Sequence, residues 1–238
     1  MLFALCKGEI IIKKIGLLVK RIKSLWKFPF DSSVVILDVG GGYLRDTTRA
    51  FHGKGYKIKV LNLIAPQKSL FYNPFAYLKR DDDVFALTQT IINSSQNEFA
   101  EEFWECCEAC LLASMTLYVC HKQPKERQNF ITAINFLNQI KYGDVALDDE
   151  MLGQMPSLEP GVFTRVLDGL IDRLRNLSVS PIREIIQEDT LDLDAFSHQK
   201  TVLFVVLPSS DQKFDCFIDM LLDQSQRCCS NIKIIDSR

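Results

Sequence analysis

Two kinds of hydrophobic pattern alternate along the chain. Short apolar runs rich in β-branched residues occupy residues 33–38, 57–64 and 201–207. Such runs are typical of buried strands in a parallel sheet. Residues 45–55, between the first two runs, suit a short crossover helix that two glycines would end. The pattern predicts a βαβ unit early in the chain and another parallel strand near its end.

The middle of the chain has a helical pattern instead. Residues 98–120 begin with glutamates in the first turn, where the helix dipole favours acids. The face expected to be buried consists of Phe103, Cys107, Cys110, Leu111, Ser114 and Tyr118. Two later helices repeat the spacing, one with Phe130, Ile134, Leu137 and Ile140, the other with Val166, Leu170, Ile171, Leu174 and Leu177. Pro181 should follow the last of them with a break.

These patterns predict an α/β fold class in which an all-α insertion interrupts a parallel sheet. The predicted parts are residues 1–30 as a basic N-terminal segment, 31–78 as the first part of the α/β domain, 79–180 as the all-α insertion and 181–238 as the return to the sheet. The charged run at residues 79–83 should cap the first helix of the insertion.

The N-terminal segment has an apolar stripe surrounded by positive charge. Residues 11–27 carry Ile and Leu at helical spacing together with Lys13, Lys14, Lys20, Arg21, Lys23 and Lys27. The lysines interrupt each apolar run well before the ~20 residues that a membrane span needs. We therefore expect this segment to lie on a membrane surface or on a partner, the alternative being an ordinary surface helix.

The composition is that of a globular protein without an overall nucleic-acid signature. The chain has 238 residues, 47% of them hydrophobic, and its formal net charge is −2. Its eight cysteines are clustered, which favours reduced thiols in a cytoplasmic setting over a disulfide framework. Cys107, Cys110, Cys120 and His121 have part of the spacing of a zinc site, but thiols packed on a core helix are the preferred interpretation.

The first predicted strand ends in a candidate cofactor site. Asp38 is followed by Gly40, Gly41 and Gly42, and the carboxyl ends of parallel strands are where ligands bind in such sheets. The run resembles the first motif of S-adenosylmethionine-dependent methyltransferases. Leu44 and Asn62 depart from that motif, because they stand where a glycine and a ribose-binding acid are expected. A methyltransferase is therefore kept as the alternative function.

A longer resemblance connects several separated segments. Residues 43–48, 55–63 and 72–78, then the stretch from 83 to 118, then residues 191–208, are similar in order to the type IV secretion coupling proteins, the TraG-type family of conjugative DNA transfer. In the family the first strand ends in Asp-Pro-Lys-Gly-Glu before an Arg-Asp-Thr helix start. The matching residues are Asp38, Gly41, Arg45, Asp46 and Thr47, whereas Val39, Gly40 and Gly42 replace the proline, lysine and glutamate.

The resemblance implies a RecA-like sheet of the P-loop NTPase type and a role in DNA transfer. The implied partners are the relaxase or relaxosome and the transferred DNA, met by the all-α domain, and other type IV secretion components. The implied location is the bacterial cytoplasm, at the inner face of the cell membrane if residues 11–27 contact it. Intact members use ATP and Mg²⁺ and form oligomers.

The nucleotide-binding motifs of that family are missing from the printed sequence. No glycine-rich loop ending in Lys and Ser/Thr occurs in it, and such a loop is what cradles the phosphates and the magnesium ion. Asp236 ends a short apolar run and could stand for the magnesium-organising acid, but we expect little structure to hold it. The sequence thus indicates a truncated member without bound cofactor or ATPase activity of its own, or else a gene remnant.

Overall fold

The described strands form one parallel sheet. The computed structural model describes residues 32–94, 101–145, 157–208 and 211–237. Within these residues the strands are β1 (Val34–Val39), β2 (Lys57–Asn62), β3 (Thr201–Leu207) and β4 (Lys233–Asp236), arranged in the order β2-β3-β1-β4. Every neighbouring pair is parallel. The predicted α/β fold class is confirmed, and so are the three predicted strands.

The fourth strand contradicts the expectation that little structure surrounds Asp236. β4 pairs with β1 over four residues, with Lys233 beside Val34 and Asp236 beside Leu37. Ser237 extends this contact, because its hydroxyl donates to the carbonyl of Leu37 at 2.6 Å. A strand so short is stabilised by the neighbour it pairs with, which local pattern does not reveal.

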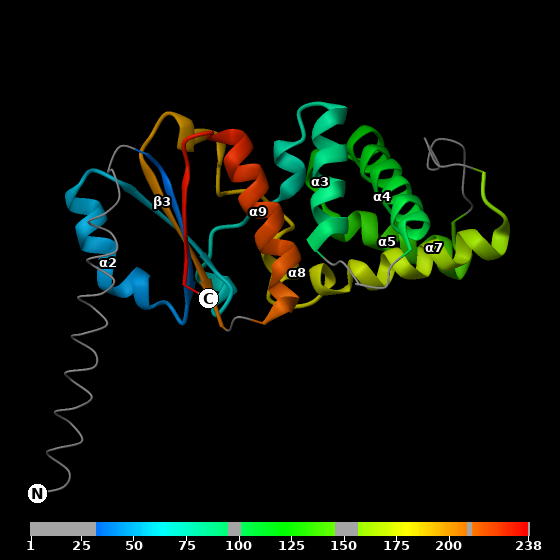
Figure 1. The fold of residues 1–238 in the computed structure, drawn as a ribbon, viewed down its shortest axis with the longest axis horizontal. Coiled ribbons are helices and arrows are strands. Elements are labelled where there is room, and N and C mark those ends of the chain that lie inside the picture. The colour runs from blue at the N-terminus through cyan, green and yellow to red at the C-terminus, as the bar shows by residue number, and fades with distance from the viewer. Residues whose placement is uncertain (1–31, 95–100, 146–156, 209–210, 238) are drawn as a thin grey trace, which may run out of the picture.

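The two faces of the sheet are covered differently. Side chains alternate along β3, so that Phe204 and its even-numbered neighbours pack toward α2 (Gly42–Gly53), while Val205 and its odd-numbered neighbours join the larger core. Figure 1 shows α2 on one side of the sheet and α9 (Asp215–Cys228) on the other. Every residue of β3 is buried, as a central strand between two layers requires.

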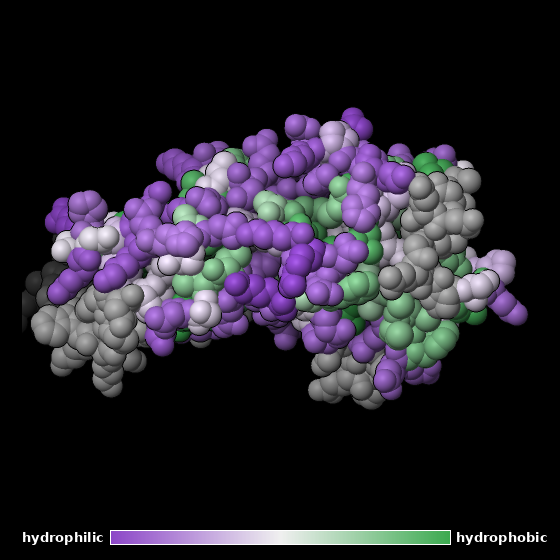
Figure 2. All heavy atoms as spheres, turned by 90° about the horizontal axis from the view of Figure 1, so that it is seen from above, coloured by the Kyte–Doolittle hydropathy of each residue, from purple (hydrophilic) through white to green (hydrophobic). Residues whose placement is uncertain are grey.

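The chain leaves the sheet after β2 and returns at β3, and the residues between are largely helical. The helices are α3 (Asp81–Ser94), α4 (Glu102–Lys122), α5 (Phe130–Tyr142), α7 (Pro160–Arg173) and the short α8 (Ile182–Ile185). Of these, α3, α4, α5 and α7 lie beyond α9 as seen from the sheet (Figure 1). One apolar cluster runs from the strands through α9 into these helices. Hydrophilic side chains cover most of the surface seen from above, and the apolar ones gather toward the helical half (Figure 2).

The helix ends follow local chemistry. The backbone amides of Lys79 and Arg80 donate to the side chain of Asp83 at 3.0 and 2.9 Å, so the charged run caps α3 as predicted. Asn129 caps α5 by accepting from the amide of Thr132, and Gly143 ends it with a positive φ.

Most of the predicted helical faces are buried, with one clear error. Cys107, Leu111 and Ser114 of α4 are buried as predicted, but Phe103 is 54% exposed. The helix begins only at Glu102, so Phe103 lies in its first turn, where its ring packs edge-on against Trp104 instead of entering the core. The third helix also ends earlier than predicted, at Arg173, although Leu174 and Leu177 beyond it are fully buried.

One helix of the described part, α4, is long and apolar enough to span a membrane by length and composition. Half of its most apolar window is buried inside the molecule, and it contacts α3, α5 and α7. Packing therefore accounts for its apolar character. Residues 11–27, the predicted basic helix, lie outside the described residues, and the boundaries of the four predicted parts stay a prediction.

Candidate functional site

The glycine turn after β1 brings the four predicted cofactor residues together. Gly40 and Gly41 have φ of 75° and 70°, a left-handed conformation that glycine adopts without strain. The amide of Gly40 donates to the carbonyl of Leu207 at 2.9 Å, which ties the turn to the end of β3. Gly42 begins α2 directly afterwards. Asp38 and the three glycines therefore surround the N-terminus of α2.

Asp38 occupies the position that this helix terminus would offer to a bound anion. Its side chain is fully buried, and its two oxygens accept from the amides of Tyr43 at 3.0 Å and Leu44 at 2.8 Å. These amides are among the donors that the first turn of a helix leaves unpaired. The geometry supports a structural role for Asp38, and cofactor binding at Asp38, Gly40, Gly41 and Gly42 stays a prediction.

Removing this carboxylate should weaken the start of α2. We expect Asp38→Ala to lower the free energy of unfolding by about 1–2 kcal/mol, the usual cost of losing a helix cap. Urea denaturation followed by circular dichroism measures the change. Asp82→Ala is the control, because the side chain of Asp82 is 81% exposed and should be worth only a few tenths of a kcal/mol. Equal effects of the two substitutions would contradict the capping role.

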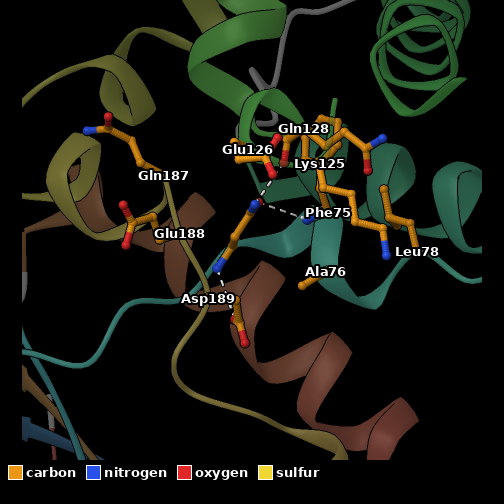
Figure 3. Close-up of a pocket in the computed structure, with 10 residues that line it drawn as sticks. Phe75, Ala76, Leu78, Lys125, Glu126, Gln128, Gln187, Glu188 and Asp189 are labelled. Atoms are coloured by element: carbon orange, nitrogen blue, oxygen red, sulfur yellow. Dashed lines mark hydrogen bonds between the residues drawn. The ribbon is translucent and has the colours of Figure 1, made fainter. Parts of the chain in front are cut away.

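A second candidate site is an open cleft between segments that connect the helices and strands. It has a volume of about 610 Å³. Three segments far apart in the sequence line it: η2 (Pro74–Tyr77), η3 (Lys125–Arg127) and residues 187–189 (Figure 3). Charged and amide side chains dominate its wall, among them Lys125, Glu126 and Glu188. The exposed Ala76 is the smallest side chain that lines it.

Asn73 joins the three segments of the cleft. Its side-chain amide donates to the carbonyl of Gln128 at 2.8 Å, and its side-chain oxygen accepts from the amide of Phe75 at 3.1 Å. Its backbone amide donates to the carboxylate of Asp189 at 3.2 Å. The dashed lines of Figure 3 follow these bonds. The base of the cleft is therefore fixed by hydrogen bonds between segments that are far apart in the sequence.

Asp189 is the polar centre of that base. The hydroxyl of Tyr77 lies 2.8 Å from both of its carboxylate oxygens, and the amide of Asp192 donates to it at 3.2 Å. Burial raises the pKa of Asp189, although the hydrogen bond from Tyr77 and those from the backbone oppose this shift. The Tyr77 oxygen in turn accepts from the amide of Leu193 at 3.1 Å. Sequence reasoning missed Asp189, because no local pattern marks it.

The Tyr77 hydroxyl should control how Asp189 ionises. We expect Tyr77→Phe to raise the pKa of Asp189 further, because a bond that favours the ionised carboxylate is lost. A carboxyl whose pKa is raised in the folded state stabilises the fold less as the pH rises from the ordinary value of 3.8 through the raised value. The loss of stability in Tyr77→Phe should therefore be larger at neutral pH than in acid.

Urea denaturation at several pH values, with NMR titration of the Asp189 carboxyl, tests this. Tyr142→Phe is the matched control, because Tyr142 is 73% exposed and its hydroxyl is open to water. A pH-independent effect of Tyr77→Phe would show that the hydroxyl does not act through Asp189.

The geometry of α4 rules out the zinc alternative. Cys107, Cys110, Cys120 and His121 all lie on this one helix. At 1.5 Å of rise per residue, Cys110 and Cys120 are about 15 Å apart along the axis, too far for ligands of one ion. In the part of the chain that the structure describes, no three Cys, His, Asp or Glu side chains form a metal-binding group. Burial raises the pKa of the Cys107 thiol, as expected for a core cysteine.

The sheet and the helices define the class of the protein: a parallel α/β fold in which a helical segment separates β2 and β3 along the chain, although the two strands are neighbours in the sheet. The model of the family described as type IV secretory system conjugative DNA transfer matches residues 27–157, more than half of the chain. The chain belongs to this family. No curated protein matches it.

Family membership settles several of the earlier alternatives. It confirms the family resemblance drawn from the segments within residues 27–157, and it associates the chain with a cytoplasmic or membrane-proximal location. The resemblance of residues 191–208 stays a prediction. Nothing supports the methyltransferase. Leu44 and Asn62, the two residues that depart from the methyltransferase motif, take part in local hydrogen bonds. The amide of Leu44 donates to Asp38, and the side chain of Asn62 accepts from the amides of Ile64 and Ala65.

Proposed function

We propose that this chain helps to recognise the relaxase-bound DNA substrate in conjugative transfer, and that the helices between β2 and β3 meet the relaxase. The family supports the setting, since the match extends from before β1 to beyond α5. Other type IV secretion components would be its further partners. The lysine-rich residues 11–27 suit a place at the inner face of the membrane.

The observation that carries the proposal is the open cleft beside Asn73. It lies between η2, η3 and residues 187–189, and its base is fixed by Asp189 and Tyr77. A preorganised polar groove loses little conformational entropy when a protein segment enters it. Its mixture of Lys125, Glu126 and Glu188 suits a polar peptide better than an apolar one.

A pull-down of the relaxase from the same genetic element tests this function. The full chain should retain the relaxase in nuclease-treated extract, and Ala76→Arg should abolish retention by filling the cleft with a long side chain. Ala50→Arg is the matched control, because Ala50 is also exposed but lies on α2. Retention by neither the wild type nor the control would refute the proposal, and so would equal retention by all three proteins.

We further propose that the 238-residue chain does not hydrolyse ATP by itself. No phosphate-binding loop occurs in its sequence, and the helix terminus next to the glycine turn is already filled by Asp38. Purified protein should release no more phosphate with ATP and Mg²⁺ than a heat-denatured sample does. Release above that level, abolished by chelation of the metal, would overturn this expectation.

A further inference from the structure

A lysine is buried in the sheet at a position that suits an apolar side chain. Lys59 lies in the middle of β2 and is only 5% exposed. Leu61, which points to the same face of the strand, joins the apolar core. Burying a charge costs free energy, and this burial lowers the pKa of Lys59 below its ordinary value of 10.5. The stability of the strand therefore does not explain the lysine.

The ammonium group of Lys59 binds a turn that lies far away in the sequence. It donates to the backbone carbonyl of Leu191 and, at 3.0 Å, to that of Asp192. It also lies 5.2 Å from the centroid of the Phe196 ring, and the face of an aromatic ring attracts a cation. Contacts from one segment, residues 191–196, thus converge on this single side chain and compensate its buried charge.

The turn that Lys59 binds has an unfavourable backbone conformation at its centre. Among the described residues, Asp192 is the one non-glycine residue with a positive φ, 53°. This conformation is disfavoured for a residue with a β-carbon, and it persists where the surroundings hold it. The flanking side chains of Leu191 and Leu193 are fully buried and anchor the turn. They do not fix the orientation of the peptide groups between them, whereas the bonds to Lys59 do.

The nitrogen side of the same two peptide groups faces the base of the cleft. The amide of Asp192 donates to the Asp189 carboxylate at 3.2 Å. The amide of Leu193 donates to the Tyr77 oxygen at 3.1 Å. A trans peptide places its oxygen and its N–H on opposite sides. Each peptide group therefore binds Lys59 through its oxygen and the pair of Asp189 and Tyr77 through its nitrogen.

We propose that Lys59 is a positioning residue of the cleft, which holds the Asp189 carboxylate and the base of the cleft in place from the opposite side of the turn. Lys59 does not itself line the cleft, so it acts through the two peptide groups. Its consequence for binding rests on the proposed function, because a base held in one geometry lets a relaxase segment enter without first ordering the cleft.

Amide hydrogen exchange of the full chain, followed by NMR, tests the inference. We expect Lys59→Met to speed exchange at the amides of Asp192 and Leu193 by about tenfold, the factor that the loss of one good hydrogen bond gives. Exchange along β3 should stay as in the wild type, because methionine keeps the apolar packing of the lysine stem. Equal acceleration in β3 would show a general loss of stability and overturn the inference, and so would unchanged exchange in the turn.

Lys57→Met is the matched control. Lys57 is exposed and belongs to the same strand, so the substitution removes the same charge and should leave exchange in the turn unchanged. An equal effect of the two methionine variants would contradict the role of Lys59. Lys59→Gln is the second variant: its side chain keeps a donor, and its exchange should lie between those of the wild type and Lys59→Met. It decides the question by the same comparison if circular dichroism melting shows that Lys59→Met does not fold.

Binding of the purified relaxase measures the consequence for the cleft. Lys59→Met should bind it about tenfold more weakly than Lys57→Met does, if one hydrogen bond at the base is lost. Faster exchange in the turn with unchanged relaxase affinity would mean that the turn does not shape the cleft, and the positioning role would be wrong. If the wild type binds no relaxase, the proposed function fails. The exchange experiment contains no relaxase, so it still decides whether Lys59 holds the base beside Asp189.

Discussion

Replacing Arg173 with alanine should lower the free energy of unfolding by about 3–5 kcal/mol, because it leaves a buried carboxylate without its counter-ion. The Arg173 side chain is 9% exposed, and its Nε donates to Glu108, itself 11% exposed, at 2.8 Å. Its Nη1 donates to the carbonyl of Ile92 at 2.9 Å. One side chain of α7 thereby binds both α4 and the end of α3.

Urea denaturation followed by circular dichroism measures this loss. Arg175→Ala is a demanding control only two residues away. Arg175 pairs with Asp172 at the surface, with both side chains more than 60% exposed, and losing such a pair costs at most about 1 kcal/mol. The double variant Arg173→Met/Glu108→Leu should be more stable than Arg173→Ala, because no buried charge then remains unpaired. A cost below that of Arg175→Ala would contradict the buried pair.

The arrangement of the helices therefore depends on polar contacts as well as on the apolar core. The contact of Arg173 with α3 and α4 fixes these helices relative to one another. Tyr72 and Gln224 connect α9 to the segment after β2: the Tyr72 hydroxyl donates to Gln224 at 2.7 Å, and Gln224 donates to the carbonyl of Pro74 at 3.0 Å. The cleft lies next to Pro74. The bond from Gln224 of α9 therefore helps to hold η2, which forms one wall of the cleft.

The central strands could be predicted from the sequence because their signal is local. Residues 201–207 are apolar or β-branched at every position, and the observed β3 has the same bounds. α5 likewise follows the predicted spacing, because Phe130, Ile134 and Leu137 are buried and Ile140 is half-buried. Local hydrophobic periodicity was sufficient to predict the segments that pack against a single core.

The cleft could not be predicted, because its residues come together only in the folded chain. Asn73 bonds with Asp189, 116 positions away, and with Gln128, 55 positions away. No spacing rule connects such positions.

Gly169 of α7 packs directly against the side chain of Glu108. Gly169→Ala should destabilise the protein by about 1–3 kcal/mol, the usual cost of overpacking a filled interior. A β-carbon at this position would collide with the Glu108 carboxylate, whose Cδ would lie 3.2 Å away. Glu108 holds that position because of Arg173, so moving aside would strain or break the ion pair.

Gly161→Ala, in the same helix, should have the opposite sign. Nothing lies within 4 Å of a β-carbon built at Gly161, and alanine is the better helix former by up to about 1 kcal/mol. The decisive comparison is made in a Glu108→Ala background. There the obstacle is absent, so adding Gly169→Ala should become neutral or stabilising. The contrary outcome is that Gly169→Ala is as destabilising without the Glu108 side chain as with it. In that case the collision with Glu108 would not cause the loss of stability, and the packing of α7 against Glu108 would not be the reason for glycine at this position.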